Sequence, residues 1–347
     1  MSIHDQASGL RQRATAAPMP GRPRRRDERM DEHCAEHCAL RMSFRAGKFR
    51  GCQADWGGGG LEAAAWLAGD WVFSMKITVT GARGFLGNAV ACELTSRGHE
   101  VCRLARPDWD MLAVGAWEAV PESVEILIHT AAAFGGTAPE EQLWRTNVAC
   151  LMGLVRRSLE LQRLRHIVFC SSGAVYAPQR EPVSLATPVR PTTVYGMTKL
   201  LGETMLRQGC EAPVTCVRLF FPFGPGQGPG RLIPRLVQSI RRGEKVILQD
   251  SGGGPRFNPL PVDRAVACLV RAAEAGGEEN RIINLGGPVA LDMRELAGRI
   301  GGVVGRVPDF HIPGSSPTRS LHCEVTKDSG TNEEFENTLV AAISAVS

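Results

Sequence analysis

Two side chains suited to proton transfer lie close together in the middle of the 347-residue chain. Tyr195 and Lys199 stand four positions apart in the run YGMTK, so a helix would place them on one face. A tyrosine of ordinary pKa is a poor base at neutral pH, but a neighbouring ammonium stabilises the phenolate and should lower that pKa. Ser171 and Ser172 come earlier and could hydrogen-bond a substrate oxygen. Such a set could move a proton to or from an alcohol or carbonyl while a nicotinamide exchanges the hydride.

A glycine pattern upstream supplies a place for the nucleotide that this chemistry needs. Gly81, Gly84 and Gly87 form G-x-x-G-x-x-G directly after the apolar run 76–80 and at the start of a helix expected over 84–97. The first glycine permits a tight turn, the second lets backbone approach a pyrophosphate, and the third allows close helix–strand packing. The helix N-terminus adds positive potential for phosphates. We therefore predict a dinucleotide-binding turn here.

The end of the second expected strand, 99–105, bears on which dinucleotide binds. An acid there would hydrogen-bond the ribose 2′-hydroxyl of NAD, whereas an arginine suits the 2′-phosphate of NADP. Ala105 stands where the acid is expected, Arg106 follows it, and Arg83 lies in the glycine turn. Two arginines without a carboxylate favour NADP slightly over NAD, and the alternative is that both are solvated surface residues.

Alternating strands and helices from residue 75 onward are expected to position these groups. The expected strands are 76–80, 99–105, 124–130, 166–171 and 214–220, and the expected helices between them are 84–97, 140–161 and 195–208. This alternation indicates the α/β class, as a Rossmann-type doubly wound parallel sheet covered on both faces. After about residue 222 the chain is rich in Gly and Pro, with helices expected near 231–242, 263–275 and 291–301. We expect this part to be a small C-terminal substrate-binding region over the carboxyl ends of the strands.

The composition changes near residue 75. Residues 1–74 contain an arginine-rich run and four consecutive glycines without sustained periodicity. We expect them to be a poorly ordered extension, or to precede a true start at Met75. Residues 75–222 are expected to form an NAD(P)-binding domain, with later elements interleaved, and 223–347 mainly the substrate-binding region.

One short run in the extension has the side chains of a metal site. His33, Cys34, His37 and Cys38 (HCAEHC) would share a helix face. A structural zinc site normally needs a second pair of ligands at loop distance, and only Cys52 follows nearby. We therefore expect no metal.

The composition argues against several classes of partner. Lys and Arg total 40 against 36 Asp and Glu, and a net charge of +4 is too weak to argue for nucleic acid. No uninterrupted apolar run approaches the roughly 18 residues of a membrane-spanning helix. Several of the eleven cysteines lie in apolar stretches, where a free thiol behaves as a small hydrophobe, and no signal peptide opens the chain. We therefore expect a cytoplasmic protein that binds neither nucleic acid nor membrane.

Six motifs in a fixed order make the chain resemble the extended short-chain dehydrogenase/reductase family, specifically its NAD(P)-dependent nucleotide-sugar epimerases, dehydratases and reductases. The likeness covers essentially all of 75–312. It is carried by TGARGFLG at 80–87, HTAA at 129–132, TNV at 146–148, SSGAVY at 171–176, YGMTK at 195–199 and RFNPLPVDR at 256–264.

The resemblance implies a role for each of these groups. Tyr195 is implied to be the acid/base, Lys199 to bind the ribose and tune Tyr195, and Ser172 to be the catalytic serine that also contacts substrate. Asn147 is implied to hold the active-site region, and Arg256 to meet the diphosphate of a nucleotide-sugar substrate. A homodimer is also implied. The implied cofactor contacts are Gly81, Arg83, Gly84, Phe85, Leu86, Gly87, Arg106, Asp110, Met111, Ala131, Ala132, Ala133, Asn147, Tyr195, Lys199 and Phe220.

Two departures from the family pattern and one likeness to a branch of the family narrow the chemistry. Gly173 and Ala174 stand where the 4,6-dehydratases carry Asp and Glu, and neither can exchange the protons of water elimination, so dehydration is disfavoured. Phe221 replaces an asparagine that contacts substrate in many members. The run 105–111 (ARPDWDM) is similar to the reductase branch, which places an Asp such as Asp110 near the adenine.

These patterns leave the reaction open between an epimerase, which keeps one cofactor, and a 4-keto reductase, which consumes NADPH. The alternative from another class is a non-catalytic Rossmann protein that senses NADP(H). Its mark would be loss of the Ser/Tyr/Lys set, which is present here. His129, His166 and Cys170 are expected to pack or cap strands rather than to catalyse.

Overall fold

The computed structural model describes residues 74–134, 138–248, 250, 252–314 and 320–346. The chain divides into two units, and all of these residues lie in the second, Gly58–Ser347. The HCAEHC run and nearly all of the 1–74 extension lie outside the described residues, so the expectations for them and for the boundary near residue 75 stay predictions. Within the described part, no helix combines the length and the apolar character needed to cross a membrane.

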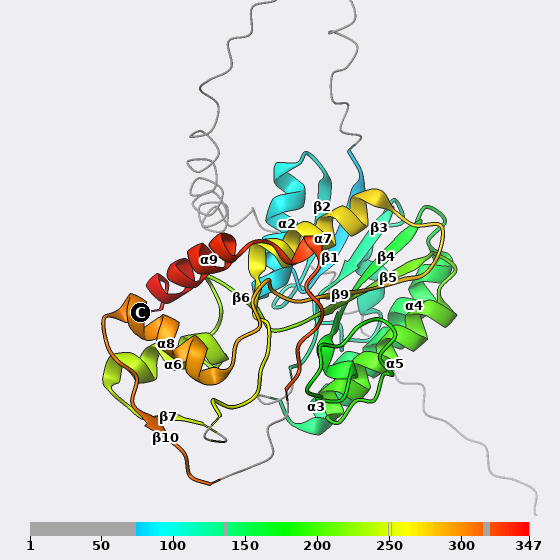
Figure 1. Ribbon diagram of the computed structural model, residues 1–347. Coiled ribbons are helices and arrows are strands. Elements are labelled where there is room, and N and C mark those ends of the chain that lie inside the picture. Colours follow the sequence, from blue (N-terminus) through cyan, green and yellow to red (C-terminus); the bar gives the residue numbers. More distant parts are fainter. Residues whose placement is uncertain (1–73, 135–137, 249, 251, 315–319, 347) are drawn as a thin grey trace, which may run out of the picture. The chain divides into compact units, whose positions relative to one another are not determined.

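A parallel sheet of six strands forms the centre of the described fold, in the order β2-β1-β3-β4-β5-β9 (Figure 1). The strands are β1 (Lys76–Thr80), β2 (Glu100–Leu104), β3 (Ile126–His129), β4 (His166–Ser172), β5 (Val214–Leu219) and β9 (Arg281–Leu285). Thr80 pairs with both Leu104 and His129, so these strands end at the same level. The order turns back between β1 and β3, which is where open α/β sheets bind ligands. The predicted Rossmann-type α/β fold is confirmed.

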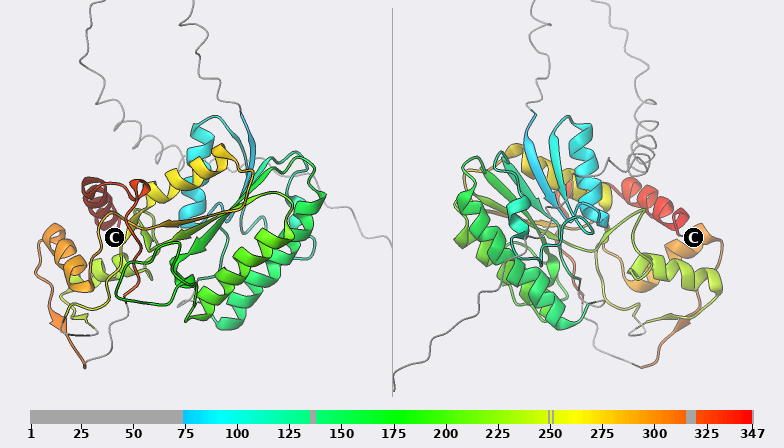
Figure 2. Two further views of the ribbon diagram at one scale, coloured as in Figure 1. Left: turned by 45° about the vertical axis from the view of Figure 1, so that its right-hand side comes forward. Right: turned by 180° about the vertical axis from the view of Figure 1, so that it is seen from behind.

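Helices cover both faces of this sheet (Figure 2). The two layers are α2 (Phe85–Ser96) with α7 (Val262–Ala275), and α4 (Cys150–Glu160) with α5 (Val194–Gly209). Successive strand side chains point to opposite faces. Ile126 and Ile128 therefore join the core under α2 and α7, while Leu127 joins the core under α4 and α5. Apolar runs without polar alternation follow from this burial on both sides.

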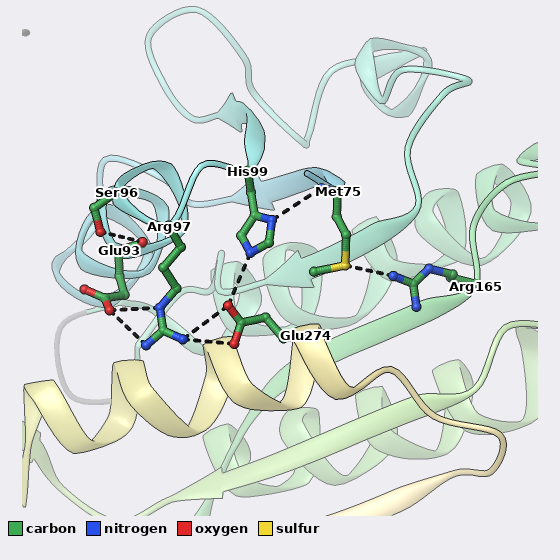
Figure 3. A network of polar contacts seen from close by, with 7 residues as sticks. All are labelled: Met75, Glu93, Ser96, Arg97, His99, Arg165 and Glu274. Atoms are coloured by element: carbon green, nitrogen blue, oxygen red, sulfur yellow. Dashed lines mark hydrogen bonds and ion pairs between the residues drawn. The ribbon is translucent and has the colours of Figure 1, made fainter. Parts of the chain in front are cut away.

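A polar network closes the amino end of the sheet against α7 (Figure 3). The N–H of Met75 donates to Nδ1 of His99 at 3.3 Å, and Nε2 of the same ring faces the Glu274 carboxylate at 3.2 Å. Glu274 also pairs with Arg97 at 2.9 Å, and Arg97 pairs with Glu93. Because Glu274 belongs to α7 and Arg97 caps α2, the network joins the two helices at the end of the sheet that lies away from the glycine turn.

The helix expected over 140–161 is present from Glu140 to Glu160, but its hydrogen-bonding pattern changes within it. It consists of α3 (Glu140–Trp144), a π-helical turn at Arg145–Ala149, and α4. This π-helical turn contains the buried Asn147, whose side chain hydrogen-bonds to the loop after β3. Hydrophobic spacing does not report such a local change of helical phase, which is often found at functional sites.

Three helices of the C-terminal part surround a second core, formed by residues such as Phe223, Leu236, Leu296 and Phe335. The elements here are α6 (Leu232–Arg242), α8 (Met293–Val304), α9 (Asn332–Ser344), β6 (Pro222–Phe223), β7 (Val246–Ile247), β8 (Leu260–Pro261) and β10 (Phe310–His311). Short 3-10 turns occur at Ala116–Ala119, Gly173–Val175 and Lys327–Ser329. The sequence patterns predict α6 and α8 but neither α9 nor β9, and the helix expected near 263–275 covers the sheet instead of joining this core.

Candidate active site

A cavity of about 1040 Å³ opens at the carboxyl end of the sheet and is lined both by strand ends and by the first turn of α6. The predicted site residues that line it are Gly81, Gly84, Phe85, Leu86, Gly87, Ala132, Ser172, Tyr195, Lys199 and Phe220. The cavity therefore brings the glycine turn and the Ser/Tyr/Lys set, far apart in the chain, to one place.

The glycine turn joins β1 to α2 and has no room for side chains at two of its positions. Gly81 adopts φ +70°, and a Cβ there would lie 2.8 Å from the backbone of Ala131. A Cβ on Gly87 would lie 2.2 Å from the Gly81 carbonyl oxygen. α2 begins at Phe85 without a side-chain cap, and its first residues line the cavity. This cradle fits the pyrophosphate of a dinucleotide, since uncapped helix N-termini bind such anions.

The packing of α5 against the turn after β4 brings Tyr195 next to Ser172. The helix begins after Thr193, whose side chain accepts a hydrogen bond from the N–H of Gly196 at 3.1 Å. A Cβ on Gly196 would lie only 2.1 Å from the carbonyl oxygen of Ala174, so this close approach requires glycine. It places Ser172 close enough to Tyr195 for the serine side chain to favour the phenolate and so to oppose the rise of the Tyr195 pKa.

Lys199 lies one turn after Tyr195 and is almost fully buried. Its Nζ donates to the carbonyl oxygen of Cys170 at 2.9 Å and lies 6.0 Å from the centre of the Tyr195 ring. Burial lowers the pKa of Lys199 to about 8, with Cys170 and Glu203 acting in the opposite sense. The ammonium is therefore retained at neutral pH, but mildly alkaline conditions suffice to remove its proton.

The net pKa of Tyr195 lies above its ordinary value and not below it as expected, because burial outweighs the influences that favour the phenolate. Burial raises the pKa of Tyr195 to about 12, and the hydrogen bond with Ser172 and the charge of Arg231 oppose this only in part. Sequence spacing reports the nearby ammonium but not the cost of ionising a phenol in an apolar wall. Tyr195 is accordingly a neutral phenol, and thus a proton donor, at neutral pH.

Tyrosinate absorbance tests this ionisation directly, because the chain contains only two tyrosines. We expect the signal of Tyr195, taken as the difference between wild type and Tyr195→Phe, to appear only well above the ordinary pKa of 10. A positive charge nearby favours the phenolate, so saturating NAD⁺ should move this signal to lower pH. Tyrosinate from Tyr195 near neutral pH without added NAD⁺ would contradict burial as the dominant cause.

Four predicted cofactor residues do not line the cavity: Arg83 in the glycine turn, and Arg106, Asp110 and Met111 after β2. Arg83 pairs with Asp108 at 2.9 Å and donates to the carbonyl oxygen of Arg106 at 3.3 Å. Asp110 accepts a hydrogen bond from the backbone two residues on, and Met111 packs against the core under α4 and α5. A contact between these residues and a cofactor stays a prediction.

Asn147 supports the loop after β3 instead of lining the cavity. Its side chain accepts from the N–H of Ala133 at 2.8 Å and donates to the carbonyl oxygen of the same residue at 2.9 Å. It also donates to Thr198 of α5 at 3.2 Å. Ala131, in the same loop, lies directly behind Gly81. Asn147 therefore ties the loop to the helix that carries Tyr195 and Lys199.

Arg256, expected to meet a substrate diphosphate, does not line the cavity. Its guanidinium donates to the carbonyl oxygen of Ala290 at 2.6 Å and lies 3.7 Å from the Glu295 carboxylate. Phe257 and Pro259 of the same run do line the cavity. The expected contact would require the Arg256 side chain to leave these partners.

A buried ion pair lies next to the site, and neither of its residues was among those predicted from the sequence. Glu203, one turn after Lys199, accepts hydrogen bonds from Arg218 of β5 at 2.6 and 2.9 Å and from Ser171 at the end of β4. Arg218 also donates to the hydroxyl of Tyr176 at 2.6 Å. The spacing of Lys199 and Glu203 was a usable signal for a shared helix face, but nothing local identified the partners on the two strands.

Aromatic rings and a guanidinium form the part of the wall near Tyr195. The Phe134 ring lies 5.2 Å from the Tyr195 ring, and Cζ of Arg231 lies 3.7 Å from the centre of the Phe134 ring. Phe221 packs 5.1 Å from Phe257 and has φ +49°, which a bulky residue rarely adopts. The Gly- and Pro-rich run before α6 indicated a loop, but no pattern indicated that Arg231 would reach this wall.

His129 and Cys170 lie near the carboxyl end of the sheet and His166 at the opposite end of β4, and all three are buried. Nδ1 of His129 lies 2.8 Å from the Thr80 hydroxyl, and burial lowers the pKa of His129 to about 3. His166 bonds to Thr215 at 2.9 Å, and burial lowers the pKa of His166 to about 4. Burial raises the pKa of the free Cys170 thiol to about 12. None of the three is poised for proton transfer at neutral pH.

Comparison with known proteins gives matches over most of the described region. Residues 77–286 match the model of the family described as the NAD dependent epimerase/dehydratase family. A UDP-glucose 4-epimerase of Streptomyces lividans is 26% identical over 288 residues, which cover 69% of this chain and 84% of that relative. A dTDP-4-dehydro-6-deoxy-D-allose reductase of a Streptomyces species is 25% identical over 280 residues, with 70% of this chain and 85% of the relative covered.

Solved structures share the fold at lower identity. A variant of the UDP-glucuronic acid 4-epimerase from Bacillus cereus, in complex with UDP-4-deoxy-4-fluoro-glucuronic acid and NAD, superposes with a TM-score of 0.70. The two are 18% identical, and the match covers 78% of this chain and 99% of the other.

Proposed function

This chain belongs to the NAD-dependent epimerase/dehydratase family, and we propose that it transfers a hydride at a ring carbon of a nucleotide sugar. It would act as an NAD(P)-dependent epimerase or 4-keto reductase with Tyr195 as acid/base. The observation that carries this proposal is that Ser172, Tyr195 and Lys199 line the same cavity as the glycine turn. The relatives support it, since they include a UDP-glucose 4-epimerase and a dTDP-sugar reductase.

Each side chain has a task in this reaction. Bound NAD(P) would supply the capacity to accept and return a hydride, and the glycine turn with the start of α2 would hold its phosphates. The Tyr195 hydroxyl gives its proton to the carbonyl oxygen when the sugar carbon is reduced, and its phenolate takes the proton back when the carbon is oxidised. Ser172 hydrogen-bonds the same sugar oxygen, and the Lys199 ammonium stabilises the phenolate.

Elimination of water from the sugar is disfavoured in this proposal. Gly173 and Ala174 line the cavity beside Ser172 and bear no ionisable group. Among the described lining residues the one carboxylate is that of Glu140, at the start of α3. The site thus lacks, beside Ser172, the acid pair that dehydration needs.

The reaction is tested by stoichiometry with purified protein. An epimerase would interconvert two nucleotide sugars, seen by NMR, with no net change in the absorbance of reduced cofactor. A 4-keto reductase would consume one NADPH or NADH for each 4-keto sugar reduced. Tight binding of NADP(H) with no turnover of any nucleotide sugar would instead support a sensing protein, and would contradict the enzyme assignment.

The slight preference for NADP belongs to the proposal and depends on Arg106. This side chain is exposed at the end of β2, whereas the charge of Arg83 is already paired with Asp108. We expect Arg106→Glu to weaken NADP binding and shift the NADP/NAD affinity ratio toward NAD by about tenfold or more, because a carboxylate repels the 2′-phosphate. Arg156→Glu, at an exposed position on α4, is the control for the change in net charge. An unchanged ratio would exclude the role given to Arg106.

A cytoplasmic homodimer also remains part of the proposal. Light scattering of the purified protein would measure the mass, and a monomer over the working concentration range would remove the dimer from it.

A further inference from the structure

Two guanidiniums line the cavity without an ion pair to any described residue, and of these only that of Arg231 is half-buried rather than exposed. Arg231 stands at the N-cap of α6 and is half-buried. Burial lowers the pKa of Arg231, and the only opposing influence is that of Tyr195. Arg83, Arg218, Arg256 and many other arginines of the described chain lie near carboxylates, but Arg231 does not. An uncompensated cation in a partly apolar wall is unfavourable unless a ligand supplies the anion.

The position of Arg231 indicates which end of a substrate it would meet. Its guanidinium stacks on Phe134, which in turn contacts the ring of Tyr195. All three side chains line the same cavity. Because Tyr195 must reach the reacting oxygen of the sugar, a group bound by Arg231 belongs to the sugar ring or its substituents. Arg235, one turn further along α6, also lines the cavity but is exposed.

The chemistry of a guanidinium selects among sugar substituents. A planar fork of N–H donors matches a carboxylate with two parallel, charge-assisted hydrogen bonds. A hydroxyl carries no negative charge, so it would not offset the free energy that desolvation of the Arg231 guanidinium costs. Glu140 also lines the cavity, but no ion pair joins its carboxylate to Arg231 among the described residues. The free acceptor must therefore come with the ligand.

We propose that Arg231 binds a carboxylate carried by the sugar ring, so that the preferred substrate is a nucleoside diphosphate linked to a uronate. This inference rests on the proposed function, because it needs the sugar to lie against Tyr195. The same guanidinium could meet an anion from another source, the diphosphate itself. The two sources differ in which ligands depend on Arg231.

Binding of three probes, UDP, UDP-glucose and UDP-glucuronate, separates these sources. We expect Arg231→Gln to weaken UDP-glucuronate binding by about 10- to 100-fold, as for loss of hydrogen bonds to a charged group. Binding of UDP and UDP-glucose, measured by calorimetry with NAD present, should change less than about threefold. Arg231→Lys keeps the charge but loses the fork of N–H donors, so its affinity for UDP-glucuronate should lie between those of wild type and Arg231→Gln. Arg242→Gln, exposed on the same helix and facing Glu244, is the matched control.

Each other outcome overturns the inference. An equal loss for all three probes would place Arg231 at the diphosphate, and no loss for any probe would remove it from the substrate site. Wild-type turnover of UDP-glucose with no preference for UDP-glucuronate would leave the proposed function standing and end this inference alone. Failure of the wild type to bind or turn over any probe would overturn both. Urea unfolding of the variants shows whether they are folded.

Discussion

Replacement of Tyr195 by Phe is expected to lower kcat by about 10²- to 10⁴-fold, the usual contribution of a positioned acid/base. The substitution removes only the hydroxyl, so the ring keeps its contact with Phe134. Cofactor affinity should be unchanged, because the glycine turn lies on a separate element, between β1 and α2. Steady-state kinetics with a nucleotide-sugar substrate and fluorescence titration with NADH measure the two quantities separately.

A second variant on the same helix controls for disturbance of α5. Met197 is 43% exposed and does not line the cavity, so Met197→Ala should leave both kcat and cofactor affinity close to wild type. If Tyr195→Phe kept kcat within threefold of wild type, Tyr195 would not be the acid/base. If both variants lost activity, the helix rather than the hydroxyl would be responsible.

The replacement Glu203→Gln is expected to lower the free energy of unfolding by about 3–5 kcal/mol. Glu203 and Arg218 are both almost fully buried, and they form two hydrogen bonds of 2.6 and 2.9 Å. Removing the carboxylate leaves a buried guanidinium without its counter-charge, which costs more than the pair itself contributes. A loss of this size is a large part of the total stability of a typical domain. Urea unfolding measures it.

A double variant distinguishes the loss of a pair from the loss of a side chain. Glu203→Leu combined with Arg218→Met removes both charges, and its stability should exceed that of Glu203→Gln. Glu160→Gln breaks exposed contacts to Arg156 and Arg157 and should change stability by no more than about 1 kcal/mol. A Glu203→Gln variant within 1 kcal/mol of wild type would show that water or rearrangement already compensates Arg218.

The same buried pair connects stability to the site. Glu203 lies one turn after Lys199 and accepts a hydrogen bond from Ser171, the neighbour of Ser172. Its charge also raises the pKa of Lys199 against the effect of burial. Loss of that charge should therefore move the pKa of Lys199 lower still, so that its ammonium is lost at a lower pH.

Much of the fold and part of the site could be predicted because their signals are local. The apolar runs and the glycines at 81, 84 and 87 identified β1, the turn and α2, since a tight turn restricts both side chain and backbone. The spacing of Tyr195 and Lys199 placed them on one face of α5. The π-helical turn near Asn147 and the elements β9 and α9 were missed, because hydrophobic periodicity is a coarse guide to helical phase and to short segments.

The sequence by itself determined the class of fold, the glycine turn between β1 and α2 and the pairing of Tyr195 with Lys199 on one helix, because each depends on residues within one turn or one strand–turn–helix unit. Only the tertiary structure decided how these residues are charged and what surrounds them. It buried Tyr195 enough to raise its pKa to about 12, joined Glu203 to a strand, and brought Arg231 to the wall beside Tyr195. Desolvation and pairing depend on which distant segments meet, and spacing along a chain does not report that.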